Sequence, residues 1–230
     1  MSSIASAQAS STDQLIEHCI DELLVSLPNP GQLSQSERRG IIARYTAVLE
    51  GNFIYWMTGA YLSVRSEEAR PIILDNLLEE VRDSHPAMLQ RFAAAAHAVP
   101  TDVDALAVSQ ALTDVRMFVG RLSAVPVLVM MAFFEGFIQR FMTFLAELAS
   151  LQGSTEQEYT EVHGVCDIAH TQGLLQALRA EALLHPAKTA QNLFEGVDLL
   201  RTLIQQIVKP GSDDNTSKQP PSESLTWGLA

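Results

Sequence analysis

Basic residues are scarce in this sequence. Of its 230 residues, 15 are Lys or Arg and 27 are Asp or Glu, which gives a formal net charge of -12 at pH 7. Nucleic acids and anionic membrane surfaces are bound mainly through Lys and Arg, so this charge argues against both as partners. A small-molecule substrate or another protein remains, and a homodimer stays open.

Cysteine is also scarce, and long apolar runs are absent. Cys19 and Cys166 lie far apart and no CxxC or Cys/His zinc spacing occurs, which argues against a disulfide framework and a structural zinc site. The N-terminal segment MSSIASAQASSTDQ lacks the basic and apolar parts of a secretory signal. The longest run of apolar or small residues, 122–134, is shorter than the roughly 20 residues that span a bilayer. These absences predict a cytoplasmic protein with a core helix at that run.

Aromatic residues make up only 7% of the chain, whereas hydrophobic residues make up 47% and are mostly Ala and Leu. Pro and Gly divide the chain into segments with helical spacing of apolar residues, which predicts an all-α bundle of seven or eight helices. The expected helices cover about residues 12–27, 36–64, 71–84, 87–98, 103–122, 125–151, 156–184 and 187–208. They form a single domain, residues 12–209, between a flexible N-terminus, residues 1–11, and a disordered tail, residues 210–230.

One carboxylate stands alone in the most apolar predicted helix. Glu135 is the only charged residue between Arg121 and Arg140, within the sequence PVLVMMAFFEGFIQ, where apolar residues occupy every face. Burying an ionised carboxylate costs several kcal/mol unless it is paired, protonated or bound to a metal. Glu135 is therefore either a metal ligand or the partner of Arg116, Arg121 or Arg140 in an ion pair.

Three potential ligands share one face of a later helix. The spacings of four and three residues in HGVCDIAH place His163, Asp167 and His170 within about 60° of arc. Imidazole and carboxylate groups suit iron or manganese. Cys166 lies about 100° round the helix from Asp167, and we expect it to be a core packing residue. The alternative is two half-buried histidines beside a solvent-exposed Asp.

A helix that ends at a His-Pro pair supplies the remaining candidates. In the sequence NLLEEV, Glu80 lies about 20° from Ile73 on the apolar stripe of this helix, whereas Glu79 points nearly opposite. Glu80 is therefore expected to face inward. Pro86 disfavours helical geometry at His85, which leaves that imidazole free to turn toward the same interior. The alternative is a helix that merely ends in charged residues.

These residues offer three carboxylates and three imidazoles from three predicted helices. Bundle proteins hold two metal ions with inward-facing groups of this kind, and six ligands suit two metals better than one. Over roughly residues 40–205 the chain resembles the haem-oxygenase-like di-iron oxidases and oxygenases. The resemblance rests on Asn-Leu-x-Glu-Glu followed by His-Pro, on an isolated Glu in an apolar helix and on His-x3-Asp-x2-His. It implies a haem-oxygenase-like domain whose metal-binding and catalytic residues are Glu80, His85, Glu135, His163, Asp167 and His170.

The gap between Glu80 and His85 is shorter than is usual in that family, so Glu79 remains an alternative ligand. The resemblance further implies two ferrous ions, with dioxygen as co-substrate, and oxidation of a small molecule in specialised metabolism. The implied outcomes are N-oxygenation, oxidative C–C cleavage or decarboxylation, and nitrile formation. The related self-sacrificing aminobenzoate synthases are excluded, because Phe134 stands where they have Tyr and this helix has no Lys.

The expected substrate is an amino acid or amino-acid derivative. Its α-carboxylate would pair best with a guanidinium group, which binds carboxylates in a bidentate manner. The candidate cations are Arg116, Arg121, Arg140 and Arg179, and the candidate pocket aromatics are Phe53, Trp56, Phe133 and Phe137. Two other functions stay open. One is a metal-free, thiaminase-like hydrolase with Cys166 as nucleophile, and the other is a non-catalytic helical adaptor.

Overall fold

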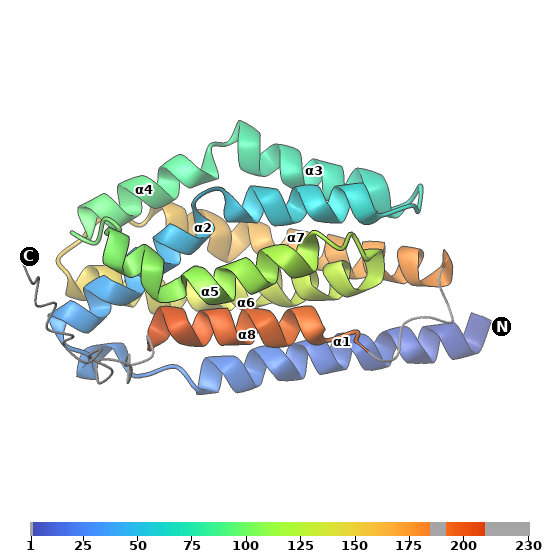
Figure 1. The fold of residues 1–230 in the computed structure, drawn as a ribbon, viewed down its shortest axis with the longest axis horizontal. Helices are drawn as coiled ribbons and strands as arrows, with labels where there is room; N and C mark the ends of the chain where they lie inside the picture. Colours follow the sequence, from blue (N-terminus) through green and yellow to red (C-terminus); the bar gives the residue numbers. More distant parts are fainter. Residues whose placement is uncertain (1, 185–191, 210–230) are drawn as a thin grey trace, which may run out of the picture.

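The computed structural model describes residues 2–184 and 192–209. These residues form eight α-helices and one 3-10 turn, with no strand among them, so the prediction of an all-α fold is confirmed (Figure 1). The helices are α1 (Ser2–Val25), α2 (Gln35–Ser63), α3 (Ala69–Arg82), α4 (His85–Ala95), α5 (Asp102–Val119), α6 (Ala124–Leu151), α7 (Glu158–Leu184) and α8 (Glu195–Val208). The 3-10 turn η1 (Pro30–Gln32) joins α1 to α2.

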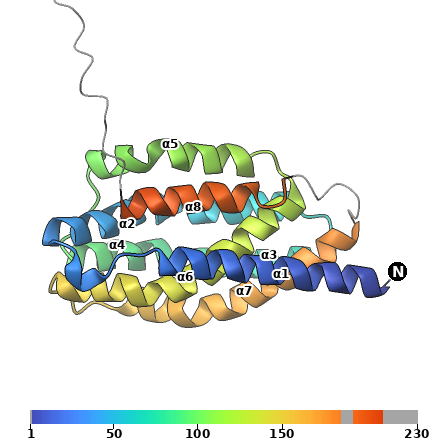
Figure 2. The ribbon, with the colours of Figure 1, turned by 90° about the horizontal axis from the view of Figure 1, so that it is seen from below.

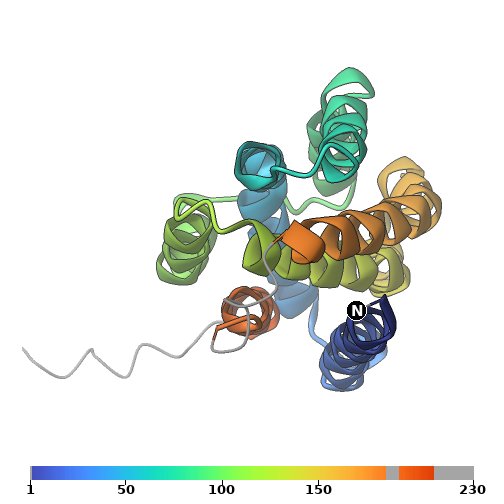
Figure 3. The ribbon, with the colours of Figure 1, turned by 90° about the vertical axis from the view of Figure 1, so that its right-hand side faces the viewer.

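Helix α6 is the central helix of the bundle. The end-on view of Figure 3 places it among α1, α2, α7 and α8, all of which pack against it. Helix α6 is long and apolar enough to cross a membrane, yet 83% of its most apolar window is buried inside the protein. The apolar run is therefore a core helix, as predicted, and Glu135 lies within the buried part of it.

The outer helices form two opposite faces around α6. Figures 1 and 2 show α1 and α8 on the face opposite α3 and α4. On the first face, Glu22 of α1 pairs with Arg201 of α8 at 3.2 Å. On the second face, both α3 and α4 pack against α7. Helices α3, α4 and α7 thus enclose one side of α6, and all the predicted ligands come from these four helices.

Helix α2 is broken where the sequence predicts one continuous helix. Glu50 (φ -59°, ψ 94°) and Gly51 (φ 84°, ψ -16°) leave the helical conformation. The backbone of Gly51 is in the left-handed region, which glycine adopts at no steric cost because it has no Cβ. Leu49 and Phe53 stand on either side of the break and are both buried. The break therefore shapes the wall that α2 presents to the interior.

The junction between α3 and α4 is as short as the His-Pro pair suggests. Asp83 ends α3, Ser84 takes a left-handed backbone (φ 58°, ψ 40°), and His85 is the first residue of α4. Pro86 occupies the first turn of α4, where its missing N–H removes no helical hydrogen bond. This tight bend brings His85 within hydrogen-bond distance of Glu80 at the end of the preceding helix.

Two helix boundaries differ from prediction by more than three residues. Helix α1 begins at Ser2 and not near Thr12, because the preceding Ala, Ser and Gln residues contain no Pro or Gly to stop a helix. Helix α8 begins at Glu195 and not near residue 187, since residues 192–194 are not helical. Residues 187–191 of that predicted helix and the predicted tail, residues 210–230, lie outside the described residues.

Candidate metal centre

The structure brings the six predicted ligands together in the interior. Helix α3 supplies Glu80, α4 supplies His85 and α6 supplies Glu135, while α7 supplies the remaining three, His163, Asp167 and His170. Each of the six residues is at most 9% exposed. Within the described residues, none of the three carboxylates pairs with Lys or Arg. Carboxylates are rarely buried without a cationic partner, so this cluster calls for another source of positive charge.

The ion pair that could have explained Glu135 does not form. Arg116 donates to Asn52 at 2.7 Å, Arg121 pairs with Glu195 at 2.7 Å, and Arg140 pairs with Asp21 at 2.6 Å. Each of these guanidinium groups is therefore engaged away from Glu135. Arg179, the fourth arginine proposed to bind the carboxylate of the substrate, pairs with Asp13 at 2.5 Å.

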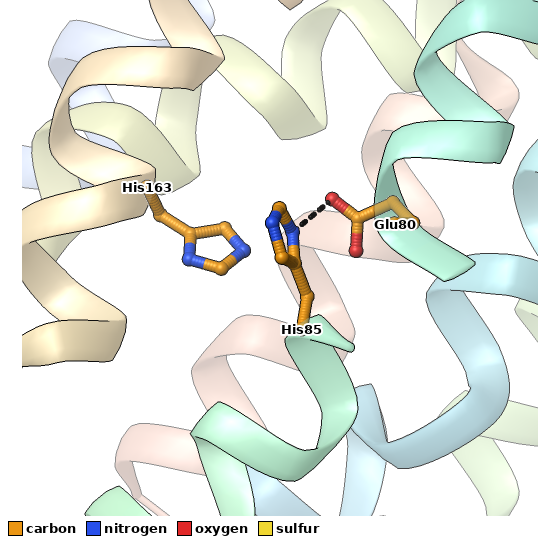
Figure 4. Close-up of side chains that lie close together, drawn as sticks. All are labelled: Glu80, His85 and His163. Atoms are coloured by element: carbon orange, nitrogen blue, oxygen red, sulfur yellow. Dashed lines mark hydrogen bonds and ion pairs between the residues drawn. The ribbon is translucent and has the colours of Figure 1, made fainter. Parts of the chain in front are cut away.

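Glu80, His85 and His163 form the first of two donor groups (Figure 4). One ligand atom from each lies within 4.8 Å of the others. Glu80 Oε1 is 2.7 Å from His85 Nδ1, and the ring centroids of His85 and His163 are 4.5 Å apart. His163 Nδ1 donates to the backbone oxygen of Tyr159 at 2.8 Å, one turn earlier in α7. The other ring nitrogen of His163 therefore points toward His85, as Figure 4 shows.

Glu135, Asp167 and His170 form the second donor group. His170 Nδ1 lies 3.5 Å from Asp167 Oδ1 and 3.7 Å from Glu135 Oε2. Imidazole and carboxylate ligands that share one ion at about 2.1 Å lie roughly 3 to 4 Å from each other. The observed separations match that range. His170 could therefore share an ion with either carboxylate at these separations.

Unpaired buried atoms in the second group fit a bound metal. Asp167 Oδ2 and His170 Nδ1 are buried and have no hydrogen-bond partner. Leaving such an atom unpaired costs about 1–3 kcal/mol, and coordination to an ion would remove that cost. The mixture of imidazole and carboxylate donors also suits iron. The residues therefore fit a bound iron ion.

Burial raises the pKa of Asp167 and of Glu80. The pKa of Asp167 rises to about 8, because its side chain is removed from water and lies near the negative charge of Glu135. Burial also raises the pKa of Glu80, although the hydrogen bond with His85 opposes this change. A raised pKa means that the ionised carboxylate is poorly stabilised by its surroundings. A bound cation would supply the positive charge that stabilises it.

The pKa values of His163 and His170 are shifted in opposite directions. Burial, together with the nearby charge of His85, lowers the pKa of His163 to about 4, so this imidazole is neutral and able to bind a metal. Burial acts in the same direction on His170, but the nearby carboxylates of Asp167 and Glu135 outweigh it and raise the His170 pKa to about 11. A protonated His170 balances part of the carboxylate charge, a role that a bound ion would take over.

The Glu79 and Glu80 side chains have different surroundings. Glu80 is buried against His85, as predicted for an inward-facing residue. The Glu79 side chain is 36% exposed, and its Oε2 lies 3.3 Å from His170 Nε2. This nitrogen is on the opposite side of the ring from the one that faces Asp167 and Glu135. The geometry therefore favours Glu80 as the ligand and places Glu79 behind His170.

Sequence reasoning missed Asn76 and misjudged Cys166. Asn76 is buried and donates to Glu135 Oε1 at 2.9 Å. Its position four residues before Glu80, on the same helical face, is the signal that could have identified it. Cys166 was expected to pack in the core, but it is half-buried and its thiol donates to Asp167 Oδ1 at 3.2 Å. Cys166 Sγ and one ligand atom each of Asp167 and His170 lie within 4.8 Å of one another, so Cys166 is a further potential donor beside the second group.

A small cavity of about 30 Å³ adjoins the donor groups. Its walls contain five of the six predicted ligands, with His170 as the exception. The other walls are almost entirely apolar and come from Leu49, Phe53, Pro86, Leu89, Phe134, Ile138 and Tyr159. The break in α2 lies between Leu49 and Phe53, so the residues on both sides of it line this cavity. None of the four candidate arginines lines it.

The predicted pocket aromatics are only partly correct. Phe53 lines the cavity, whereas Trp56, Phe133 and Phe137 are buried elsewhere in the core. Trp56 packs edge-on against Phe134, which does line the cavity. The signal for Phe134 was its place next to Glu135 in the sequence, and the prediction of Phe133 and Phe137 assumed the wrong rotation of α6.

Comparison with known proteins agrees with this chemistry. No curated protein and no solved structure matches the chain. The model of one family, described as iron-containing redox enzyme, matches residues 42–202, which is more than half of the chain. The matched region includes all six candidate ligands and the helices that carry them. The chain therefore belongs to the haem-oxygenase-like family of iron-containing redox enzymes.

Proposed function

We propose that this iron-containing redox enzyme binds two ferrous ions and uses dioxygen to oxidise a small molecule. The observation that carries the proposal is the set of six buried ligand groups, arranged in two adjacent donor groups without a Lys or Arg partner in the described residues. A single ion would leave part of this carboxylate charge unbalanced. Two ions account for both donor groups and for the unpaired atoms of the second group.

The proposed ligands divide between the ions by position. Glu80, His85 and His163 would hold one ion, and Glu135, Asp167 and His170 would hold the other. The bound iron supplies the redox chemistry with dioxygen. Within the protein, Asn76 orients Glu135 by donating to Oε1, which leaves Oε2 to face His170. The Tyr159 backbone oxygen orients His163 in the same manner through Nδ1.

The cavity indicates which part of the substrate would meet the metals. Apolar side chains such as Leu49, Phe53 and Phe134 cover the side of the cavity that the ligands do not. They exclude water from the reacting groups and favour an apolar part of the substrate, for which the cavity of about 30 Å³ would have to widen. We therefore propose that an amino-acid-derived substrate would present its apolar side chain here. Its α-carboxylate would not pair with any of the four candidate arginines, which are engaged in other contacts.

Anaerobic loading with ferrous iron, followed by addition of dioxygen, tests the proposal. We expect about two irons per chain and a transient visible absorption once dioxygen is added. Glu135→Ala and His163→Ala are each expected to lower the iron content, because each removes a ligand. His18→Ala serves as the control, since His18 is exposed on α1. Iron uptake that these two ligand variants leave unchanged, or no response to dioxygen, would refute the proposal.

The metal-free hydrolase is disfavoured because its proposed nucleophile, Cys166, is held as a protonated thiol. Burial and the adjacent charge of Asp167 raise the pKa of the Cys166 thiol far above its ordinary range, so the reactive thiolate is absent at neutral pH. That function predicts that Cys166→Ser abolishes activity and that a chelator has no effect. The di-iron proposal predicts inactivation by the chelator.

The non-catalytic adaptor is disfavoured by the cost of the buried cluster. An adaptor gains nothing from three buried carboxylates, of which Asp167 and Glu80 have raised pKa values because of burial. It predicts that Glu135→Ala and His163→Ala leave function unchanged. Each variant would then retain the binding activity of the parent protein and fold with equal or greater stability.

A further inference from the structure

Two adjacent glutamates at the end of α3 contact different histidines. Glu80 Oε1 is 2.7 Å from His85 Nδ1, inside the cluster. Glu79 Oε2 is 3.3 Å from His170 Nε2, at the edge of the cluster, and its side chain is 36% exposed. Glu79 is therefore placed to act on the metal centre from outside, through His170 alone.

The two nitrogens of His170 face different groups. Nε2 faces Glu79, whereas Nδ1 is buried without a hydrogen bond and lies 3.5 Å from Asp167 and 3.7 Å from Glu135. A neutral imidazole carries one proton, so the nitrogen that binds a metal must be the one without it. A carboxylate beside Nε2 favours the proton there, which leaves the Nδ1 lone pair free on the side of the proposed ligands.

The close packing of α3 against α7 makes this contact possible. Gly173 lies one turn after His170, and a Cβ at this position would be only 2.9 Å from Ile72 Cγ2. Because glycine has no side chain, the two helices can approach closely there. This approach brings the end of α3 beside the last ligand of α7. The contact between Glu79 and His170 thus depends on the close packing of α3 against α7 at Gly173.

The outer nitrogens of the candidate histidines have different partners. His163 Nδ1 donates to a backbone oxygen of its own helix, and His85 Nδ1 contacts Glu80, a proposed ligand. Only His170, among the three, contacts a carboxylate that is not itself a proposed ligand. A carboxylate in that position orients an imidazole and increases its strength as a ligand, and its loss typically weakens metal binding 10- to 100-fold.

We propose that Glu79 is a positioning residue for the second metal ion. It accepts the Nε2 proton of His170 and so holds the ring with Nδ1 toward Asp167 and Glu135. This inference rests on the proposed di-iron function, since it assumes that the second donor group binds an ion. It assigns to Glu79 a task that differs from ligation, although the sequence left Glu79 open as an alternative ligand.

Titration of the full-length protein with Co(II) alone tests the proposal, because each bound ion has visible absorption bands. Glu79→Gln keeps the size of the side chain but removes its charge. We expect this variant to bind one of the two Co(II) ions about 10- to 100-fold more weakly than the parent, with the other ion unchanged. Asp75→Asn is the matched control, since Asp75 is an exposed carboxylate on the same helix. This control should bind both ions as the parent does.

A double-mutant cycle distinguishes an effect of Glu79 that acts through His170 from a general weakening of metal binding. His170→Ala should weaken the same ion as Glu79→Gln, and the double variant should bind no more weakly than His170→Ala. If the parent binds two ions and Glu79→Gln binds both within twofold of it, the inference is wrong while the di-iron function stands. Equal weakening of both ions would also overturn the inference. A parent protein that binds fewer than two ions would overturn both proposals.

The protonation of His170 provides a direct measurement. With 15N-labelled histidine and Zn(II) as a diamagnetic probe, NMR should show His170 protonated at Nε2 and bound to the metal through Nδ1. His170→Ala identifies the signal by its loss. Binding of His170 through Nε2 would refute the inference, whatever the affinities are.

Discussion

The buried carboxylate of Asp167 is expected to destabilise the metal-free protein, and Asp167→Asn tests this expectation. Asp167 is 1% exposed, and burial together with Glu135 raises its pKa from the ordinary value of 3.8 to about 8. An acid whose folded-state pKa lies above its unfolded value favours folding most at low pH. That contribution is lost as the pH rises from about 4 to about 8.

The size of the effect follows from the pKa difference. At about 1.4 kcal/mol for each unit of pKa, the carboxyl costs the folded state about 5 kcal/mol at pH 8 and between 1 and 2 kcal/mol, roughly, at pH 5. Asn removes this cost, but it weakens the contacts with Cys166 and His170, which offsets about 2 kcal/mol. We therefore expect Asp167→Asn to stabilise the metal-free protein by about 3 kcal/mol at pH 8 and hardly at all at pH 5.

Urea unfolding followed by far-ultraviolet circular dichroism measures the difference after treatment with a chelator. The free energy of unfolding is compared at pH 5 and pH 8 for the parent and for Asp167→Asn. Asp75→Asn, which changes an exposed carboxylate, should show no such gain at either pH. A variant less stable than the parent at pH 8, or one with an equal gain at both pH values, would refute the reasoning. The same variant should lose one of the two proposed ions, because a ligand is gone.

Three further changes have defined outcomes. Asn76→Ala should weaken binding of one ion 10- to 100-fold in a Co(II) titration, because Glu135 loses the donor that orients it. Gly51→Ala should lower the free energy of unfolding by about 1 kcal/mol, since the Cβ meets no neighbouring atom but the positive φ is strained. Gly164→Ala is its control, because it also meets no neighbouring atom but lies in regular helix, so it should be neutral or stabilising. Saturation with ferrous iron under anaerobic conditions should raise Tm by several degrees, and a chelator should reverse the rise, because only the folded chain holds the ligands together.

Local patterns in the sequence predicted much of the candidate site. The helical repeat determines which side chains share a face, so His163, Asp167 and His170 could be grouped without knowledge of the fold. Composition identified Glu135, because a single carboxylate in an apolar helix must be buried with it. The His-Pro pair located the end of α3 and the bend that places His85 beside Glu80. Each of these inferences depends on residues within one helix or at its end.

Contacts between helices could not be predicted in the same way. The four candidate arginines were plausible substrate partners in the sequence, but three of them pair with acidic residues of α1 or α8 and Arg116 donates to Asn52. The rotation of α6 decided that Phe134, and not Phe133 or Phe137, lines the cavity. These outcomes depend on how whole helices pack, which is set by many side chains far apart in the chain.

Glu79 and Glu80 of α3 illustrate the difference between what the sequence determined and what the tertiary structure decided. The apolar stripe of the helix was sufficient to turn Glu80 inward and Glu79 outward, since that choice depends only on angles around one helix axis. The contact of Glu79 with His170 required α7 to lie against α3, at a distance that Gly173 permits and a larger residue would not. The sequence by itself thus determined which groups could bind metal, because ligand chemistry and helical periodicity are local. Only the tertiary structure decided which groups support those ligands, because that depends on the spacing between helices.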